Sequence, residues 1–318
     1  MNIKRYIHNL FHHQSDSASR ERDIIRKIEE ASAKMSAMMR QHAINSYNQA
    51  FLEGNYGLTD DKLCESEVIV SLTTYGTRID KVYLTIESIM QGVVKPNRIV
   101  LWLSKDEFSM QTIPATLLKQ KERGLQIEFC EDIRSYKKLI PTLKMYPEAC
   151  IVTIDDDVMY EIDFMDKLLR THKKHPENVL VNVARQIVVA DGEVLSYIRW
   201  KHITNDAQIK TPYIIGIGVG GILYPAHSLH EEVMNQEAFM SLCPYGDDIW
   251  FYAMAIKNNT KTLKSPSNQV DGDFVDIYDE SLDTLSIKNT SAEDNRNDKQ
   301  FKAVFEKYQL WKMLKSDK

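Results

Sequence analysis

Three consecutive aspartates, Asp155, Asp156 and Asp157, directly follow the apolar run Ile151–Ile154. Because Ile and Val favour a pleated, enclosed environment, the run predicts a buried strand. The carboxylates must then emerge at its carboxyl end, since an unpaired charge is costly to bury, and ligands bind at that edge of open α/β sheets. Adjacent carboxylates repel one another unless a cation neutralises them. A hard divalent ion that leaves room for phosphate oxygens meets this need, whereas the alternative interpretation is an acidic, solvated turn.

The spacing of Asp155 and Asp157 distinguishes this cluster from two other acidic motifs. An aspartyl-phosphatase motif requires Val or Thr where this chain has Met159, and a prenyl-chain DDxxD motif requires an acid where it has Tyr160. Two alternating aspartates at the end of a strand can both reach one metal ion, directly or through water. That ion would bridge a diphosphate and neutralise the charge that develops on a departing nucleotide. We therefore predict that Asp155 and Asp157 hold Mn²⁺ or Mg²⁺.

A second acidic site, Asp247-Asp248, follows Gly246 and opens an apolar helix that extends to Ile256. Helix capping and the helix dipole account for one carboxylate at this position. A second carboxylate, close to the aromatic Trp250, leaves room for a catalytic base. Both interpretations remain open on these residues alone.

A glycine-rich run matches G-x-G-x-x-G at Gly216, Gly218 and Gly221. A dinucleotide-binding fingerprint precedes a helix, but this run precedes a strand-like segment and lies far from the first strand. The run instead predicts a backbone that comes very close to a ligand or to another segment of the chain.

Strands and helices alternate around these motifs. We expect strands at 68–73, 98–103, 126–130, 151–154 and 179–183, and helices at 80–90, 115–122, 141–146, 164–175 and 247–256. Such alternation predicts parallel βαβ units with right-handed crossovers. The pair Asp191-Gly192 predicts a tight hairpin. Amphipathic helices are expected near both ends of the chain, from Ser19 to about Phe51 and from Lys299 to Leu314.

Length and composition limit the class of protein. The 318 residues allow one large domain with additions, or two domains. A formal net charge of -5 argues against a duplex nucleic-acid binder, which usually carries a strongly basic face. The four cysteines, Cys64, Cys130, Cys150 and Cys243, are far apart and form no pair with metal-binding spacing, which favours a reducing cytoplasm. No window is long and apolar enough to span a bilayer.

Five segments, taken in order, resemble a nucleotide-sugar-dependent glycosyltransferase with the GT-A fold, similar to the family-two enzymes of bacterial surface-polysaccharide pathways. The resemblance covers approximately residues 66–268 and is carried by Ser71–Arg78, Tyr136–Pro141, Ile154–Asp157, Gly220–Pro225 and Gly246–Trp250. It implies an α/β fold with a Rossmann-like, mostly parallel sheet flanked by helices, to which helices are added at the amino and carboxyl ends. The expected parts are an N-terminal helical extension (1–60), the glycosyltransferase domain (61–268), and a C-terminal loop and helix (269–318).

The resemblance also implies roles for individual residues. The loop after the first strand, with Thr73, Tyr75 and Arg78, would hold the nucleotide, and Asp132 would face the edge of the base. Asp155 and Asp157 would bind the metal diphosphate, Lys138 would approach the phosphates, Asp156 would contribute to substrate binding, and Gly220 and Gly221 would shape the acceptor side. Asp248, beside Asp247, would be the general base that deprotonates the acceptor hydroxyl. Direct displacement by that hydroxyl would invert the anomeric centre.

The expected activity is therefore metal-dependent transfer of a sugar from a nucleoside diphosphate donor, with UDP favoured, to a saccharide or lipid-linked saccharide. The expected location is cytoplasmic. The terminal helices suggest peripheral contact with the inner membrane face, or a homo-oligomer formed through the N-terminal helix, although packing on the protein's own body is the simpler interpretation.

Two alternative functions remain open, and the chain departs from the family pattern in one respect. The chain could be a nucleotidyltransferase-like enzyme that acts on nucleoside diphosphates, but such an enzyme would carry a glycine-rich loop where this chain has only Gly76. It could also be a non-catalytic scaffold. No His follows His230, so a further metal ligand late in the chain is either different or absent.

Overall fold

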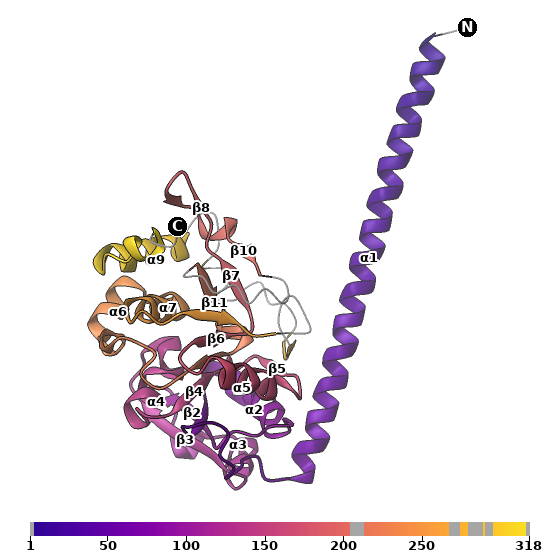
Figure 1. The fold of residues 1–318 in the computed structure, drawn as a ribbon. Helices are drawn as coiled ribbons and strands as arrows, with labels where there is room; N and C mark the ends of the chain where they lie inside the picture. The colour runs from indigo at the N-terminus through magenta and orange to yellow at the C-terminus, as the bar shows by residue number, and fades with distance from the viewer. Residues whose placement is uncertain (1–2, 204–212, 267–273, 279–288, 290–294, 316–318) are drawn as a thin grey trace. The chain divides into compact units, whose positions relative to one another are not determined.

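The computed structural model describes residues 3–203, 213–266, 274–278, 289 and 295–315. The chain divides into two compact units, Met1–Ser46 and Tyr47–Lys318. Helix α1 (Ile3–Glu53) forms the first unit and continues into the second, so the expected N-terminal helix is confirmed and begins earlier than Ser19 (Figure 1). Within the described residues, no helix combines the length and the apolar composition needed to cross a membrane.

The second unit is built on a seven-stranded sheet with the strand order β13-β6-β12-β4-β1-β2-β3. Paired strands are parallel except at β12, which is antiparallel to both β4 and β6. The expected α/β class, with a mostly parallel, Rossmann-like sheet, is confirmed. The strands are β1 (Val68–Thr73), β2 (Arg98–Ser104), β3 (Leu125–Cys130), β4 (Cys150–Thr153), β6 (Val179–Val181), β12 (Ile222–Tyr224) and β13 (Thr262–Lys264).

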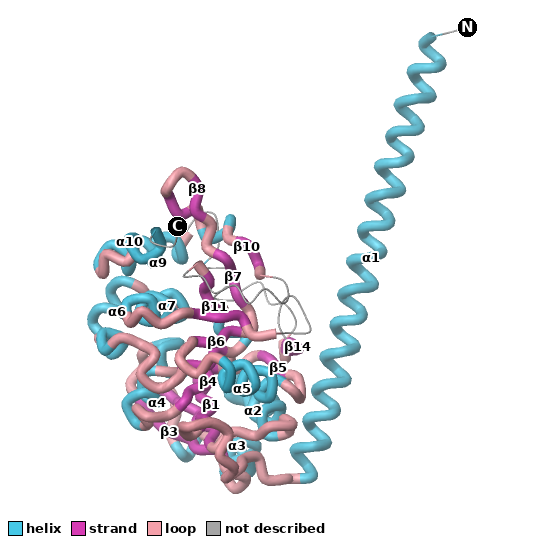
Figure 2. Tube along the Cα trace, in the orientation of Figure 1, coloured by secondary structure: helices cyan, strands magenta, loops and turns pink. Residues whose placement is uncertain are grey.

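Each face of the sheet has its own apolar core, because successive residues of a strand point to opposite faces. In β1, Ile69 belongs to one core, and Val70 and Leu72 belong to the other. The core that contains Val70 also contains buried apolar side chains of α2, α3 and α5. The core that contains Ile69 contains those of α4, α6, α7, α9 and α10, so helices flank both faces of the sheet (Figure 2). The helices are α2 (Val82–Met90), α3 (Ala115–Lys121), α4 (Ile140–Met145), α5 (Phe164–Lys174), α6 (Gln236–Leu242), α7 (Asp247–Lys257), α9 (Arg296–Lys307) and α10 (Trp311–Lys315).

Three small sheets complete the described part of this unit. Strands β10 (Lys201–His202), β7 (Ala184–Gln186) and β11 (Ile214–Gly216) form one, and β14 (Phe274–Asp276) pairs with β5 (Val158–Tyr160). The third joins β8 (Val189–Ala190) to β9 (Glu193–Val194). Asp191 and Gly192 connect these two strands with φ of 51° and 79°, and positive φ at both turn positions is typical of a two-residue hairpin, so this prediction is confirmed.

The aromatic residues of the C-terminal helices pack inside the second unit. Phe301 and Phe305 of α9 are 3% and 0% exposed, and their rings contact Trp200 and Tyr252. Packing in the core therefore accounts for the apolar spacing between Lys299 and Leu314. The division of the chain at residues 60 and 268 remains a prediction. Two elements that follow residue 268 join the main body, since β14 pairs with β5 and α9 packs against α7.

Candidate active site

The three aspartates lie in the turn between β4 and β5. Because β4 and β1 are parallel neighbours, the loop that follows β1 reaches the same edge of the sheet. In that loop, Oγ1 of Thr74 donates a hydrogen bond to Oδ2 of Asp156 (2.5 Å). Nη1 of Arg78 lies 2.8 Å from Oδ1 of Asp156 and 2.9 Å from Oδ2 of Asp157. The loop that is expected to hold the nucleotide is therefore hydrogen-bonded to Asp156 and Asp157.

Asp156 connects the turn after β4 to the loop after β1. Its side chain is buried, and each of its oxygens accepts a hydrogen bond from the β1 loop. Burial raises the pKa of Asp156, and the charge of Arg78 opposes that rise. The contacts with Thr74 and Arg78 give Asp156 a structural role, and its expected contact with substrate remains a prediction.

Asp157 retains capacity to bind a cation. Burial raises its pKa to about 7, the charges of Asp155 and Asp156 add to the rise, and Arg78 opposes it. Its Oδ1 is buried and has no hydrogen-bond partner in the described part of the chain. A buried carboxylate oxygen without a partner is unfavourable, and a bound cation would satisfy it.

Lys138 connects the two acidic motifs. It ends the short helix η3 (Arg134–Lys138) and is 5% exposed. Its Nζ lies 3.0 Å from Oδ1 of Asp155, 2.9 Å from Oδ2 of Asp247 and 3.8 Å from Oδ1 of Asp248. Burial alone would lower the pKa of Lys138, but these three carboxylates raise it well above its ordinary value. A permanent positive charge therefore lies between the motifs.

Asp247 and Asp248 differ in their surroundings, although both begin α7. Oδ1 of Asp247 accepts a hydrogen bond from Oγ of Ser135 (2.8 Å), and its side chain is 11% exposed. Oδ2 of Asp248 accepts one from the backbone N–H of Gly218 (2.8 Å), and its side chain is 25% exposed. Burial raises the pKa of Asp248 to about 7, Lys138 opposes the rise and Asp247 adds to it. Asp248 is thus the more accessible of the two, with a pKa suited to accepting a proton.

The glycine run approaches this site at Gly218, in the short helix η5 (Gly218–Gly220). A Cβ at Gly218 would lie 2.6 Å from Nζ of Lys138 and 3.0 Å from Oδ1 of Asp248, so a side chain there would disturb both. At Gly220 and Gly221 the absence of a side chain is required by packing, because a Cβ would clash with Val183 or Phe164, respectively. The close backbone approach predicted from G-x-G-x-x-G is confirmed at Gly218, whereas the acceptor role of Gly220 and Gly221 remains a prediction.

The other residues expected to contact the nucleotide each have a partner within the protein. Oγ1 of Thr73 donates to the carbonyl of Trp102 (2.9 Å), and Tyr75 is 49% exposed, with the guanidinium of Arg78 5.1 Å from its ring centroid. Asp132 follows β3, pairs with Lys137 and accepts a hydrogen bond from the backbone N–H of Arg134 (3.0 Å). Their roles toward a nucleotide remain predictions.

Three further residues belong to the site but were not predicted. The hydroxyl of Tyr160 accepts a hydrogen bond from the N–H of Asp155 (3.1 Å) and donates one to the carbonyl of Val219 (2.9 Å). Ser135 orients Asp247, and the ring of Tyr278, after β14, lies 5.8 Å from the guanidinium of Arg78. Ser135 and Tyr160 each adjoin a predicted motif, which is a usable signal. Tyr278 has no motif around it.

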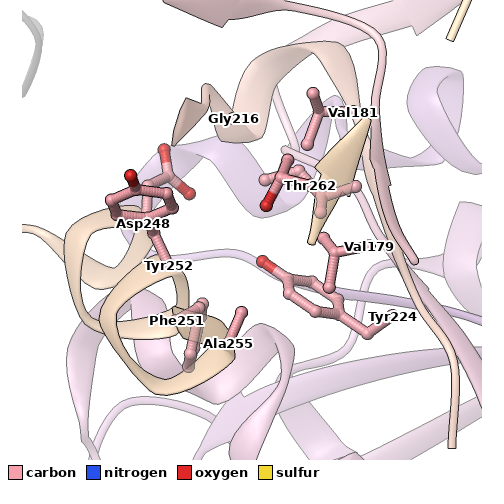
Figure 3. Close-up of a pocket in the computed structure, with 10 residues that line it drawn as sticks. Val179, Val181, Gly216, Tyr224, Asp248, Phe251, Tyr252, Ala255 and Thr262 are labelled. Carbon is pink, nitrogen blue, oxygen red and sulfur yellow. The ribbon is translucent and has the colours of Figure 1, made fainter. Parts of the chain in front are cut away.

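Asp248 also lines a small pocket between α7 and strands β6, β11, β12 and β13 (Figure 3). Tyr224, Tyr252 and apolar side chains form most of its wall. Asp155, Asp157 and Lys138 do not line this pocket, and Asp248 is the residue that it shares with the two acidic motifs.

The donor set at the aspartates suits a hard divalent ion that shares its coordination with a ligand. In the described part of the chain, no three carboxylates of this site bring oxygens within 4.8 Å of one another. The protein would therefore supply one or two carboxylates, which is the usual arrangement for Mg²⁺ bound with substrate phosphates. The unpartnered Oδ1 of Asp157 fits such an ion.

Comparisons with known proteins give weak likenesses to enzymes that bind nucleotides or nucleotide sugars. No family model matches the chain, and no curated protein sequence matches it. One similar solved structure is the mannosyltransferase PcManGT from Pyrobaculum calidifontis in complex with GDP-Man and Mn²⁺, at 16% identity and a TM-score of 0.42, over 74% of this chain and 66% of that one. Another is CMP:2-keto-3-deoxy-manno-octonic acid synthetase complexed with CTP, at 11% identity and a TM-score of 0.36, over 66% of this chain and 94% of that one. This chain thus spans just under two thirds of the mannosyltransferase.

Proposed function

We propose that this protein is a divalent-metal-dependent glycosyltransferase that moves a sugar from a nucleoside diphosphate donor to a hydroxyl group. The observation that carries the proposal is the position of Lys138, whose buried ammonium contacts Asp155 of the first acidic motif and Asp247 of the second. One motif is suited to a metal diphosphate and the other to a general base, and sugar transfer requires both within reach of the same carbon.

The donor would bind at the edge of the sheet where β1 and β4 end. Asp155 and Asp157 would hold Mn²⁺ or Mg²⁺, which when bound neutralises charge on the departing diphosphate. Lys138 would bind a phosphate oxygen as a point charge. The nucleoside, with uridine favoured, would contact Thr73, Tyr75 and Arg78, and Asp132 would meet the edge of the base.

Asp248 would act as the base. Its carboxylate would accept the proton of the acceptor hydroxyl while the hydroxyl oxygen bonds to the anomeric carbon and the bond from that carbon to the diphosphate breaks. Attack opposite the leaving group inverts the anomeric centre. The N–H of Gly218 orients the carboxylate of Asp248, and Ser135 holds Asp247 beside it. Gly220 and Gly221 would shape the acceptor side.

The acceptor would be a saccharide or lipid-linked saccharide of a cell-surface polysaccharide pathway. The enzyme would work beside the inner membrane face, and α1 would supply either peripheral membrane contact or a contact with a second copy of the chain. Flotation of the full-length protein with anionic vesicles tests the membrane contact. Protein that stays at the bottom of the gradient rejects it, and light scattering then tests for the oligomer.

The test of the function is product analysis with a panel of nucleotide sugars and Mn²⁺. Release of nucleoside diphosphate, stopped by a chelator and by Asp157→Asn, supports the glycosyltransferase. Release of pyrophosphate from nucleoside triphosphate and sugar phosphate would make the protein a nucleotidyltransferase. Absence of nucleotide binding and of turnover with every donor would leave a scaffold.

A further inference from the structure

Two cysteines and a histidine from three separate elements meet at the edge of the sheet opposite the aspartates. Cys64 lies in the loop between α1 and β1, Cys150 is the first residue of β4, and His172 lies in the last turn of α5. Their ligand atoms, two sulfurs and one ring nitrogen, all lie within 4.8 Å of one another. In the described part of the chain this is the only group of three His, Cys, Asp or Glu residues that meets that limit.

The histidine of this group has an unsatisfied atom. His172 is 7% exposed, and its Nδ1 is buried with no hydrogen-bond partner among the described residues. Buried polar atoms are normally hydrogen-bonded, and an exception calls for an explanation such as an ion. Cys150 is 1% exposed and Cys64 is half-buried, so the site is enclosed on the side of the sheet and open beside Cys64.

We propose that Cys64, Cys150 and His172 bind a Zn²⁺ ion, with water in the fourth position on the open side of Cys64. Two thiolates and an imidazole are the ligands that Zn²⁺ prefers. Tetrahedral Zn²⁺, with bonds of about 2.3 Å to sulfur and about 2.0 Å to nitrogen, requires ligand atoms about 3.5 to 4 Å apart. The ligand atoms of Cys64, Cys150 and His172 lie within 4.8 Å of one another, which is compatible with this spacing. Each thiol gives up its proton to solvent on binding, and the imidazole binds in its neutral form.

The position of the ion indicates a structural role. The N–H of Cys150 bonds to the carbonyl of Glu67 (2.9 Å), and Cys150 stands opposite Val68 in the β1–β4 register. A bond from Cys64 through the ion to Cys150 and His172 would fasten the loop that precedes β1 to both β4 and α5. This role is independent of the proposed glycosyltransferase activity, because the aspartates lie at the other end of β4.

Cobalt binding tests the proposal with a direct spectroscopic signature. The reduced, full-length protein is freed of metal and titrated with Co²⁺, which reports thiolate ligands by charge-transfer absorption and tetrahedral geometry by its visible bands. We expect one Co²⁺ per chain to show both signatures. Zn²⁺ should displace it, whereas a large excess of Mg²⁺ should not. Asp157→Asn should leave the spectrum unchanged.

Three variants complete the experiment. Cys64→Ser, at a half-buried loop position, and His172→Gln should each lower Co²⁺ affinity by at least about 100-fold, more than the loss of an outer-shell partner causes. Cys130→Ser, another half-buried cysteine but outside the group, should bind as the parent does. Circular dichroism confirms that each variant is folded. The proposal is wrong if the parent shows no thiolate absorption, if Cys64→Ser or His172→Gln binds normally, or if Cys64 and Cys150 form a disulfide and the reduced protein binds no metal.

Discussion

Nζ of Lys138 lies 2.9 Å from Oδ2 of Asp247, and the same nitrogen lies 3.0 Å from Oδ1 of Asp155. A buried cation in this position holds the turn after β4 against the first turn of α7. It also keeps two groups of like charge close together, which would otherwise repel.

Replacing Asp157 with Asn should abolish metal-dependent binding of the donor without unfolding the protein. The substitution keeps the shape of the side chain and removes the charge that would hold the ion. Calorimetry with and without a chelator measures the effect. Asp106→Asn, an exposed acid after β2, is the control and should bind like the parent. Equal donor affinity of the parent protein with and without chelator would contradict the prediction.

Asp248→Asn should lower kcat by about 10²- to 10⁴-fold, the usual contribution of a positioned base, while donor affinity stays nearly unchanged. Asp247→Asn should lower kcat less, because Asp247 bonds to Ser135 and Lys138 and would only orient its neighbour. Steady-state kinetics with saturating acceptor distinguish the two. If Asp247→Asn were inactive while Asp248→Asn remained active, Asp247 would be the base and Asp248 the orienting residue. If both variants remained active, the pair would only cap the helix.

The rate should rise with pH and level off above about 7. Burial raises the pKa of Asp248 to about 7, Lys138 opposes the rise and Asp247 adds to it. Below that pH the carboxyl is protonated and cannot accept a proton, so kcat/KM should fall by about tenfold per pH unit. Asp157 has a pKa of similar height, but its protonation would be overcome by more metal. An acidic limb that moves to lower pH when Mn²⁺ is raised would therefore assign the limb to Asp157.

Lys138→Met should destabilise the fold by about 3 to 5 kcal/mol, because removing one partner of a buried ionic group leaves the others uncompensated. Lys137→Met is the matched control. Lys137 is also buried, at 4% exposed, but it pairs with Asp132, whose side chain is 50% exposed. Its loss should therefore cost less. Urea denaturation measures both, and equal losses would show that the carboxylates around Lys138 do not depend on its charge.

Much of the fold follows from local sequence. The run Val68–Thr73 forms a strand with the predicted bounds, and the aspartates emerge at the carboxyl end of β4, as an apolar run followed by carboxylates requires. Composition and periodicity act over a few residues, so these features do not depend on distant partners. Strand direction does depend on the path of the chain between strands. The antiparallel β12 and the pairing of β14 with β5 were therefore decided by tertiary structure.

The same distinction holds for the sites. Asp155, Asp157, Asp247 and Asp248 stand out in the sequence because unpaired acids beside apolar runs need an explanation. The convergence of Asp155, Asp247 and Asp248 on Lys138 is not visible in the sequence, because it requires β4, η3 and α7 to reach one edge of the sheet. Cys64, Cys150 and His172 carry no signal at all in the sequence, because metal-binding spacing is recognisable only when ligands share a turn or a helix. Pairing of β1 with β4 and packing of α5 on the sheet bring these three side chains together, and only the folded chain contains those long-range contacts.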